Sequence, residues 1–214
     1  MSAFAVELND RPVVTVSTDG LDLLDVQISG DRIGPELANL RVSGGSYPDG
    51  KPSTYLIWQD ETPLEAGDRV SVTFLKEGRP SRAGQTIEQL YPNESPKPKR
   101  PFAPPEQMIR EAMQMPKQHQ ALSFRVVGPN GTETDGTTTE DEHGFGFSVS
   151  WTCLRPEWAR VALHTYTLQS LVDRQNGTYH ARRRLQHGQG VVFTMAPNST
   201  VERDARKSGA RPSP

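Results

Sequence analysis

Apolar and polar residues alternate over most of this chain, a pattern typical of β-strands, because successive strand side chains point to opposite faces. In the first part of the chain the alternation covers residues 4–8, 14–16, 24–28, 40–42, 55–58 and 70–74. In the later part it covers residues 122–126, 145–149, 161–163, 179–185 and 191–195. Pairs such as Asp19-Gly20 and Asn130-Gly131 stand between these segments and predict turns. The pattern therefore predicts an all-β fold.

The chain also repeats itself at an offset of 121 residues. Residues 24–42 align with residues 145–163, and the same offset aligns residues 64–74 with residues 185–195. The matched pairs include Ser29 with Ser150, Pro35 with Pro156, Glu36 with Glu157 and Gly67 with Gly188. Because two separate blocks preserve both strand phase and turn position, we interpret them as an internal duplication.

The duplication predicts two tandem, small β-sandwich-like or barrel-like domains joined by a Pro-rich linker and a short helix. The expected boundaries are residues 1–92 for the first copy, 93–117 for the connection, 118–197 for the second copy and 198–214 for a disordered tail. Within the connection, residues 106–115 predict a helix whose apolar stripe docks on a β copy. The stripe consists of Met108, Ile109, Ala112 and Met113. Whether the copies pack together, and whether each is a sandwich or a barrel, stays open.

Composition narrows the class of protein. Hydrophobic residues make up 34% of the chain and its net charge is −2, values that favour modest cores over disorder. The single Cys153 excludes an internal disulfide and a multi-cysteine zinc site. No apolar run has the length of a membrane helix and no signal peptide opens the sequence, so we expect a cytoplasmic protein. No phosphate-binding, zinc-protease or nucleophile-elbow motif is present, and no cofactor or metal is expected.

Charge is divided between the two copies. Residues 1–92 carry a net charge of −6 and residues 93–214 a net charge of +4. In the second copy, strand phase puts His180, Arg182 and Arg184 on one face and Tyr179 on the other. We interpret this row as the charged face of an edge strand rather than a nucleic-acid site, because no aromatic residue is interleaved with it.

Other candidate residues have simpler interpretations. Trp58, Trp151 and Trp158 are most simply residues of the core or its edge. A nucleophile–base pair of Cys153 and His164 is opposed by strand phase, which puts His164 on the wet face.

The first copy resembles small uncharacterised bacterial β-domain proteins. The segments that carry the resemblance are VELNDRPVV, LDLLDVQISG, NLRVSGG and LEAGDRVSVTFLKEG, which cover about 90 residues. The second copy departs from the pattern, since Gln189 stands where the first copy has Asp68. The resemblance implies an accessory or immunity partner of bacterial toxins and secretion systems, and no catalytic residue carries over.

These observations favour a non-enzymatic module that binds a protein, such as a toxin-neutralising immunity protein or a secretion accessory. The expected partner is a basic protein rather than a nucleic acid or a membrane, because the first copy is acidic. The expected binding residues are Asp22, Asp25, Asp31, Asp60, Glu61, Glu65 and Asp68. One alternative is a hydrolase or nucleotide-handling enzyme with a site between the copies, lined by Glu36, Glu157, Cys153 and His164. Another is a structural component of a phage or secretion particle.

Overall fold

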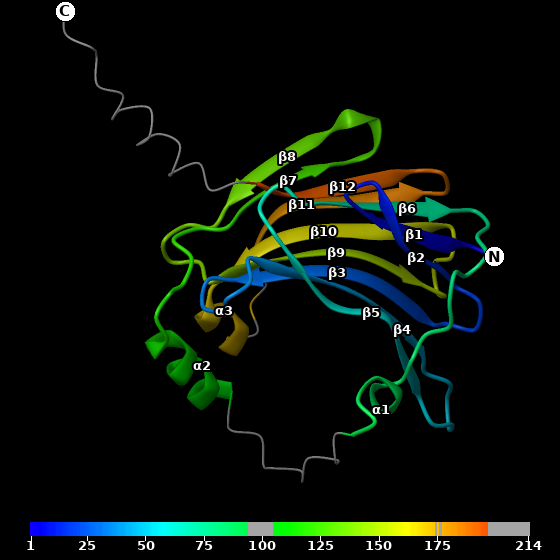
Figure 1. Cartoon of the computed structure of the whole chain (residues 1–214), viewed down its shortest axis with the longest axis horizontal. Helices are drawn as coiled ribbons and strands as arrows, with labels where there is room; N and C mark the ends of the chain where they lie inside the picture. Colours follow the sequence, from blue (N-terminus) through cyan, green and yellow to red (C-terminus); the bar gives the residue numbers. More distant parts are fainter. Residues whose placement is uncertain (94–104, 174, 176, 197–214) are drawn as a thin grey trace, which may run out of the picture.

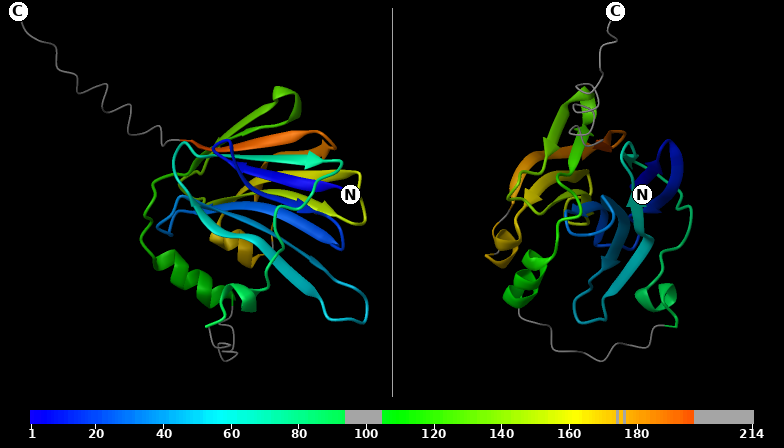
Figure 2. Two further views of the ribbon diagram at one scale, coloured as in Figure 1. Left: turned by 45° about the vertical axis from the view of Figure 1, so that its right-hand side comes forward. Right: turned by 60° about the vertical axis from the view of Figure 1, so that its left-hand side comes forward.

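The computed structural model describes residues 1–93, 105–173, 175 and 177–196. Its strands form two six-stranded antiparallel sheets that pack face to face (Figures 1 and 2). Sheet A has the strand order β2-β1-β6-β12-β7-β8, and sheet B has the order β11-β10-β9-β3-β4-β5. The strands of the first half are β1 (Ala3–Leu8), β2 (Arg11–Ser17), β3 (Leu23–Asp31), β4 (Ala38–Ser46), β5 (Thr54–Leu64) and β6 (Arg69–Leu75). Those of the second half are β7 (Ser123–Val127), β8 (Glu133–Thr137), β9 (Gly144–Thr152), β10 (Trp158–Tyr166), β11 (Thr178–Gln186) and β12 (Gly190–Ala196). The expected all-β fold is confirmed.

The two halves have the same strand order and share both sheets. Strand β6 pairs with β12 in sheet A, and β3 pairs with β9 in sheet B, so hydrogen bonds cross from one half to the other in each sheet. Gln27 lies opposite Ser148, and Ser71 lies opposite Val192; in both pairs a residue faces its own counterpart 121 positions later. An internal two-fold axis therefore passes through the centre of both sheets, and the copies pack side by side into one sandwich.

Turn geometry follows the duplication as well. Gly67 and Gly188, aligned by the repeat, both have positive φ angles, of 95° and 82°. The β1–β2 turn at Asn9 and the β7–β8 turn at Asn130 match in the same way, with φ angles of 53° and 64°. Asparagine and glycine are the residues that tolerate this left-handed region most readily. The repeat thus preserves the positions where the backbone has to turn.

One hydrophobic core lies between the sheets and contains residues of both halves. The inward positions alternate along each strand, as the sequence predicts; along β3 they are Leu24, Val26 and Ile28, and along β9 they are Phe145, Phe147 and Val149. Trp58 and Trp151 are buried, as expected. Because each inward side chain on a strand alternates with an outward one, the opposite face of sheet B presents mostly polar residues to solvent.

The helices are short and lie at the margin of the sandwich (Figure 1). They are α1 (Ile87–Leu90), α2 (Pro105–Gln114) and α3 (Leu168–Val172). The predicted helix is confirmed as α2, but its neighbour is α3 rather than a β copy. Met108 and Met113 are about half exposed, at 49% and 55%, so the predicted docking of the apolar stripe on a sheet is wrong. The expected tail, residues 198–214, lies outside the described residues, as does most of the Pro-rich linker.

Candidate functional site

The outer face of sheet B gathers most of the chemically interesting side chains of the molecule. Its middle strand, β9, presents small residues outward, and the larger side chains of β10 lie over them. The ring of His164 lies where a side chain on Gly146 would be, and the hydroxyl of Tyr166 lies where one on Gly144 would be. On one side of this strip stand β3, β4 and β5 with several carboxylates, and on the other stand β10 and β11 with several arginines.

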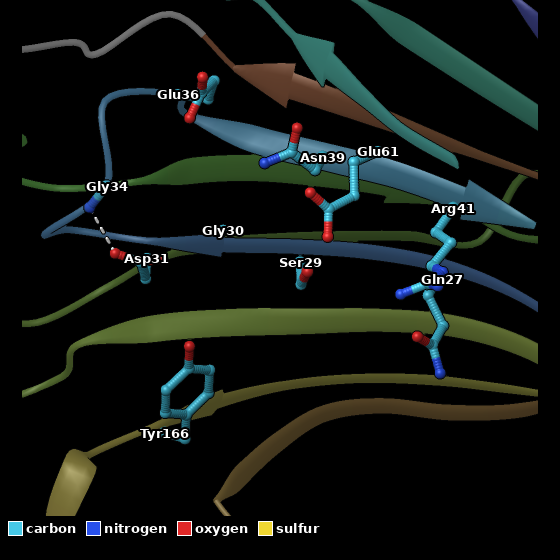
Figure 3. A pocket seen from close by; sticks show the side chains of 10 residues that line it. All are labelled: Gln27, Ser29, Gly30, Asp31, Gly34, Glu36, Asn39, Arg41, Glu61 and Tyr166. Carbon is cyan, nitrogen blue, oxygen red and sulfur yellow. Dashed lines mark hydrogen bonds between the residues drawn. The ribbon is translucent and has the colours of Figure 1, made fainter. Parts of the chain in front are cut away.

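On the acidic side a hollow of about 290 Å³ opens between β3, β4 and β5 (Figure 3). We call it the acidic hollow. It is lined by Gln27, Ser29, Gly30, Asp31, Gly34, Glu36, Asn39, Arg41, Glu61 and Tyr166. Figure 3 shows the Glu61 side chain among those of Asn39 and Arg41 on the same side of the hollow. Three carboxylates against one guanidinium make the lining acidic.

Asp31 shapes the loop at one end of the hollow. Its carboxylate oxygen Oδ1 accepts hydrogen bonds from the backbone N–H groups of Ile33 and Gly34, at 2.8 and 2.6 Å. Burial, together with the negative charge of Asp31, raises the pKa of the Tyr166 hydroxyl to about 12. Tyr166 therefore keeps its proton at neutral pH and presents a hydrogen-bonding hydroxyl to the hollow.

Asp25 lies further along β3 on the same face. It accepts hydrogen bonds from the Ser150 hydroxyl at 2.8 Å and from the Gln27 amide at 2.6 Å. Burial raises the pKa of this carboxyl, an effect that the hydrogen bonds and the charge of Arg160 oppose. Asp25 thus links the acidic side of the face to the small residues of β9.

The other expected binding residues are spread around the molecule. Asp60 is engaged by the Arg41 guanidinium at 3.6 Å and by the Tyr91 hydroxyl. Asp68 lies in the β5–β6 turn with Glu65, where it accepts from the Glu65 backbone N–H and from the Asn9 side chain. Of the seven expected residues, the acidic hollow brings together Asp31 and Glu61.

Asp22 lies before β3 and fastens two loops. It accepts hydrogen bonds from the backbone N–H of Tyr47, from the Ser46 hydroxyl at 3.2 Å and from the Cys153 thiol at 3.3 Å. The Tyr47 bond is the main reason why the pKa of this carboxyl is lowered. These bonds give Asp22 a structural role.

On the basic side a β-bulge changes the expected strand phase. The register of β10 and β11 shifts between Leu163 and His164, which puts His164 opposite Tyr179. Tyr179 consequently lies on the outer face, where its ring stacks under the Arg182 guanidinium at 3.5 Å. His180 instead contacts Thr165 at 2.9 Å and the ring of Phe124. The predicted grouping of His180 with Arg182 and Arg184, opposite Tyr179, is therefore wrong.

Trp158 also belongs to this outer face. It is half-buried and lies under the guanidinium groups of Arg184 and Arg155, at 4.5 and 5.6 Å from the ring centre. Sequence reasoning assigned Trp158 to the core or its edge because it aligns with Leu37. The signal that could have corrected this is the alternation of β10, in which Ala159, Val161 and Leu163 take the inward positions.

The residues expected for an enzymatic alternative do not meet in one cleft. Glu36 lines the acidic hollow, while Glu157 and Cys153 line two other hollows. The hydrogen bond to Asp22 raises the pKa of the Cys153 thiol, which opposes the thiolate that a nucleophilic cysteine requires. Burial lowers the pKa of His164, which lies near the far end of β10.

Within the described ranges, no cluster of three or more histidine, cysteine, aspartate and glutamate side chains is placed to hold a metal ion. None of the helices in the described residues has the length and apolar character needed to span a membrane. Comparison of the chain with models of protein families, with curated proteins and with solved structures finds no match. The functional argument therefore rests on the geometry of the outer face of sheet B.

Proposed function

We propose that this protein is a non-enzymatic binding module that receives a basic protein partner at the acidic hollow. The observation that carries the proposal is the state of Glu36 and Glu61. Both are exposed, line the hollow and form no ion pair with any described residue, whereas nearby Arg41 is engaged by Asp60. An acidic surface that lacks internal counter-charges attracts and steers a cationic partner.

The size of the hollow supports a side chain as the occupant. Its volume of about 290 Å³ lies at the lower end of the range of small-molecule pockets, about 300–1,000 Å³. A lysine or arginine side chain of the partner would lay its stem along Ser29 and Gly30 and present its charge to Glu61. Asp31 contributes a further negative charge at the loop end.

The resemblance of the first half to bacterial accessory and immunity-like proteins supports a more specific proposal. In it, the partner is a basic toxin or secretion component that is bound stoichiometrically. Such a function needs a surface and no catalytic residues, in keeping with an acidic hollow on a rigid sheet.

The test is direct binding of a labelled hexa-arginine peptide to the full chain, followed by fluorescence anisotropy. The double variant Glu36→Gln/Glu61→Gln keeps side-chain shape and removes two charges. We expect it to weaken binding at least about fivefold at low salt, because exposed charges are poorly screened there. Glu65→Gln removes one charge in the β5–β6 turn and is the matched control; it should bind nearly as the wild type.

Equal affinity of the wild type and the double variant would refute the acidic hollow as the binding surface. An equal loss in Glu65→Gln would also count against the proposal, since it would mean that net charge alone attracts the peptide. A hexa-glutamate peptide serves as the negative control.

A further inference from the structure

The basic side of the same face carries a second set of residues, which the acidic hollow does not use. We call it the arginine–aromatic strip; it consists of Arg155, Trp158, Arg160, Tyr179, Arg182 and Arg184. The four arginines are exposed, and none forms an ion pair with a described carboxylate. Asp25, the acid that acts on Arg160 electrostatically, is already hydrogen-bonded to Ser150 and Gln27.

Two of these arginines oppose each other directly. Arg160 of β10 is the cross-strand partner of Arg184 of β11, and Ala162 is the partner of Arg182. Like charges directly opposite on neighbouring strands are destabilising. Uncompensated charge of this kind, concentrated on two adjacent strands, is what an anion-binding surface requires.

The aromatic rings orient the guanidinium groups. Arg182 stacks on Tyr179 at 3.5 Å, and Arg184 stacks on Trp158 at 4.5 Å. A guanidinium that stacks through its flat face keeps its N–H groups in the plane of the fork, available for the paired oxygens of a phosphate. The stacking thus holds the donors ready without occupying them.

Spacing and flanking surface favour a chain of phosphates with planar groups between them. Arg182 and Arg184 are two residues apart on one strand, which separates them by roughly 6.6 Å along the strand. Hollows of about 390 and 410 Å³ flank Trp158, lined by Arg184 on one side and by Arg155 and Arg160 on the other. Cationic grooves with interleaved aromatic residues are the means by which proteins bind single-stranded nucleic acid.

We propose that the arginine–aromatic strip binds single-stranded nucleic acid, with phosphates on Arg160, Arg182 and Arg184 and a base at Trp158. The reason for discounting nucleic acid on sequence grounds was that no aromatic residue is interleaved with the arginines. The bulge at Leu163 and His164 supplies Tyr179, and the outward position of Trp158 supplies the second ring. This site is separate from the acidic hollow, and its probes carry the opposite charge.

The experiment measures anisotropy of labelled homopolymers of about 15 nucleotides, oligo-dT and oligo-U, with the full chain, a length that matches the site of one or two small domains. Arg182→Ala/Arg184→Ala should weaken binding at least about tenfold and reduce the slope of log affinity against log salt by about two, one for each lost phosphate contact. Arg11→Ala, which removes an exposed arginine from β2 in sheet A, is the matched control and should change neither quantity appreciably.

Two further variants test the aromatic part. Trp158→Ala should weaken binding by about fivefold or more, because loss of one stacked base carries at least that effect. Arg184→Lys keeps the charge but loses the flat fork, and it should bind measurably more weakly than the wild type. Circular dichroism and thermal unfolding of each variant verify that the fold is intact.

Three results would overturn the proposal. Binding of the oligonucleotides that is undetectable at low salt, or unchanged in Arg182→Ala/Arg184→Ala, would remove the strip as a site. Equal affinity for a duplex of the same length would show a general polyanion surface without base stacking. Tighter binding of a poly-glutamate peptide than of either oligonucleotide would assign the strip to an acidic protein. None of these results depends on the hexa-arginine experiment, so failure of one proposal leaves the other testable.

Discussion

The two sides of the outer face of sheet B have the same backbone and opposite chemistry. Glu61 in the acidic hollow and Arg182 in the arginine–aromatic strip are equivalent positions of the repeat, 121 residues apart. Asn39 and Arg160 are equivalent in the same way. Inward positions of the two halves, by contrast, stay apolar because both contribute to one core. The duplication preserved what the sandwich needs and left the solvent-facing positions free to diverge into two binding surfaces.

The comparison is sharpest at one corner of each half. Arg32 follows β3, is 5% exposed and donates hydrogen bonds to the backbone carbonyls of His119, Thr139, Glu140 and Glu142. Its counterpart after β9 is Cys153, which is exposed. The guanidinium therefore fastens the β3–β4 loop to segments of the second half.

Replacing Arg32 should have the largest effect on stability. Arg32→Ala leaves several buried carbonyls without a donor, and we expect it to lower the free energy of unfolding by about 3 kcal/mol or more. Cys153→Ala at the equivalent corner should change that free energy by less than about 0.5 kcal/mol. Urea unfolding followed by circular dichroism measures both. Similar values for the two variants would contradict the structural role given to Arg32.

The turn glycines should behave alike in the two halves. Gly67 and Gly188 have positive φ angles and open space around them, so a methyl group at either position meets only the backbone penalty. We expect Gly67→Ala and Gly188→Ala each to cost about 1–2 kcal/mol, the usual penalty of the left-handed conformation. Chemical unfolding of both variants tests this equality. A large difference would break the equivalence of the halves at this turn.

The smallest expected effect concerns two neighbouring acids with opposite pKa shifts. The hydrogen bond from Tyr47 lowers the pKa of Asp22, so its carboxylate contributes stability at neutral pH that is lost as pH falls below 3.8 toward the folded-state pKa. Burial raises the pKa of Asp25, so its charge opposes folding at neutral pH, and stability relative to Asp25→Asn rises as pH falls through the raised pKa toward 3.8.

Urea unfolding of Asp22→Asn and Asp25→Asn across this pH range separates the two residues. The stability difference between the wild type and Asp22→Asn should shrink on acidification. The wild type should gain relative to Asp25→Asn over the same range. The same trend in both variants would mean that one of the two environments is misassigned.

Local pattern predicted the strands well, because burial of one face fixes period-two alternation in segments such as β3 and β9. It missed β8, whose residues Glu133–Thr137 are polar, although the repeat of β2 offered a signal. It also missed α1, although Thr86 and Gln89 form a capping box that is readable from the sequence.

What the sequence could not supply is set by non-local pairing. The bulge at Leu163 and His164 reverses the outward phase of β11, and no residue type there signals it. The acidic hollow depends on bringing Tyr166 of the second half beside Asp31 of the first, which follows from the pairing of β3 with β9. Of the expected binding residues, the hollow accordingly contains only part.

The pairing of each half with its own repeat has a consequence for assembly. A single half would leave β3 and β6 as open edges, each matched to the same edge of another half by the two-fold axis. Separate halves would therefore join in a bimolecular reaction whose extent depends on protein concentration. The covalent connection between residues 93 and 117 replaces that dependence with a fixed effective concentration, of millimolar order for short flexible tethers. The sandwich can therefore stay assembled at dilutions where two free halves would part.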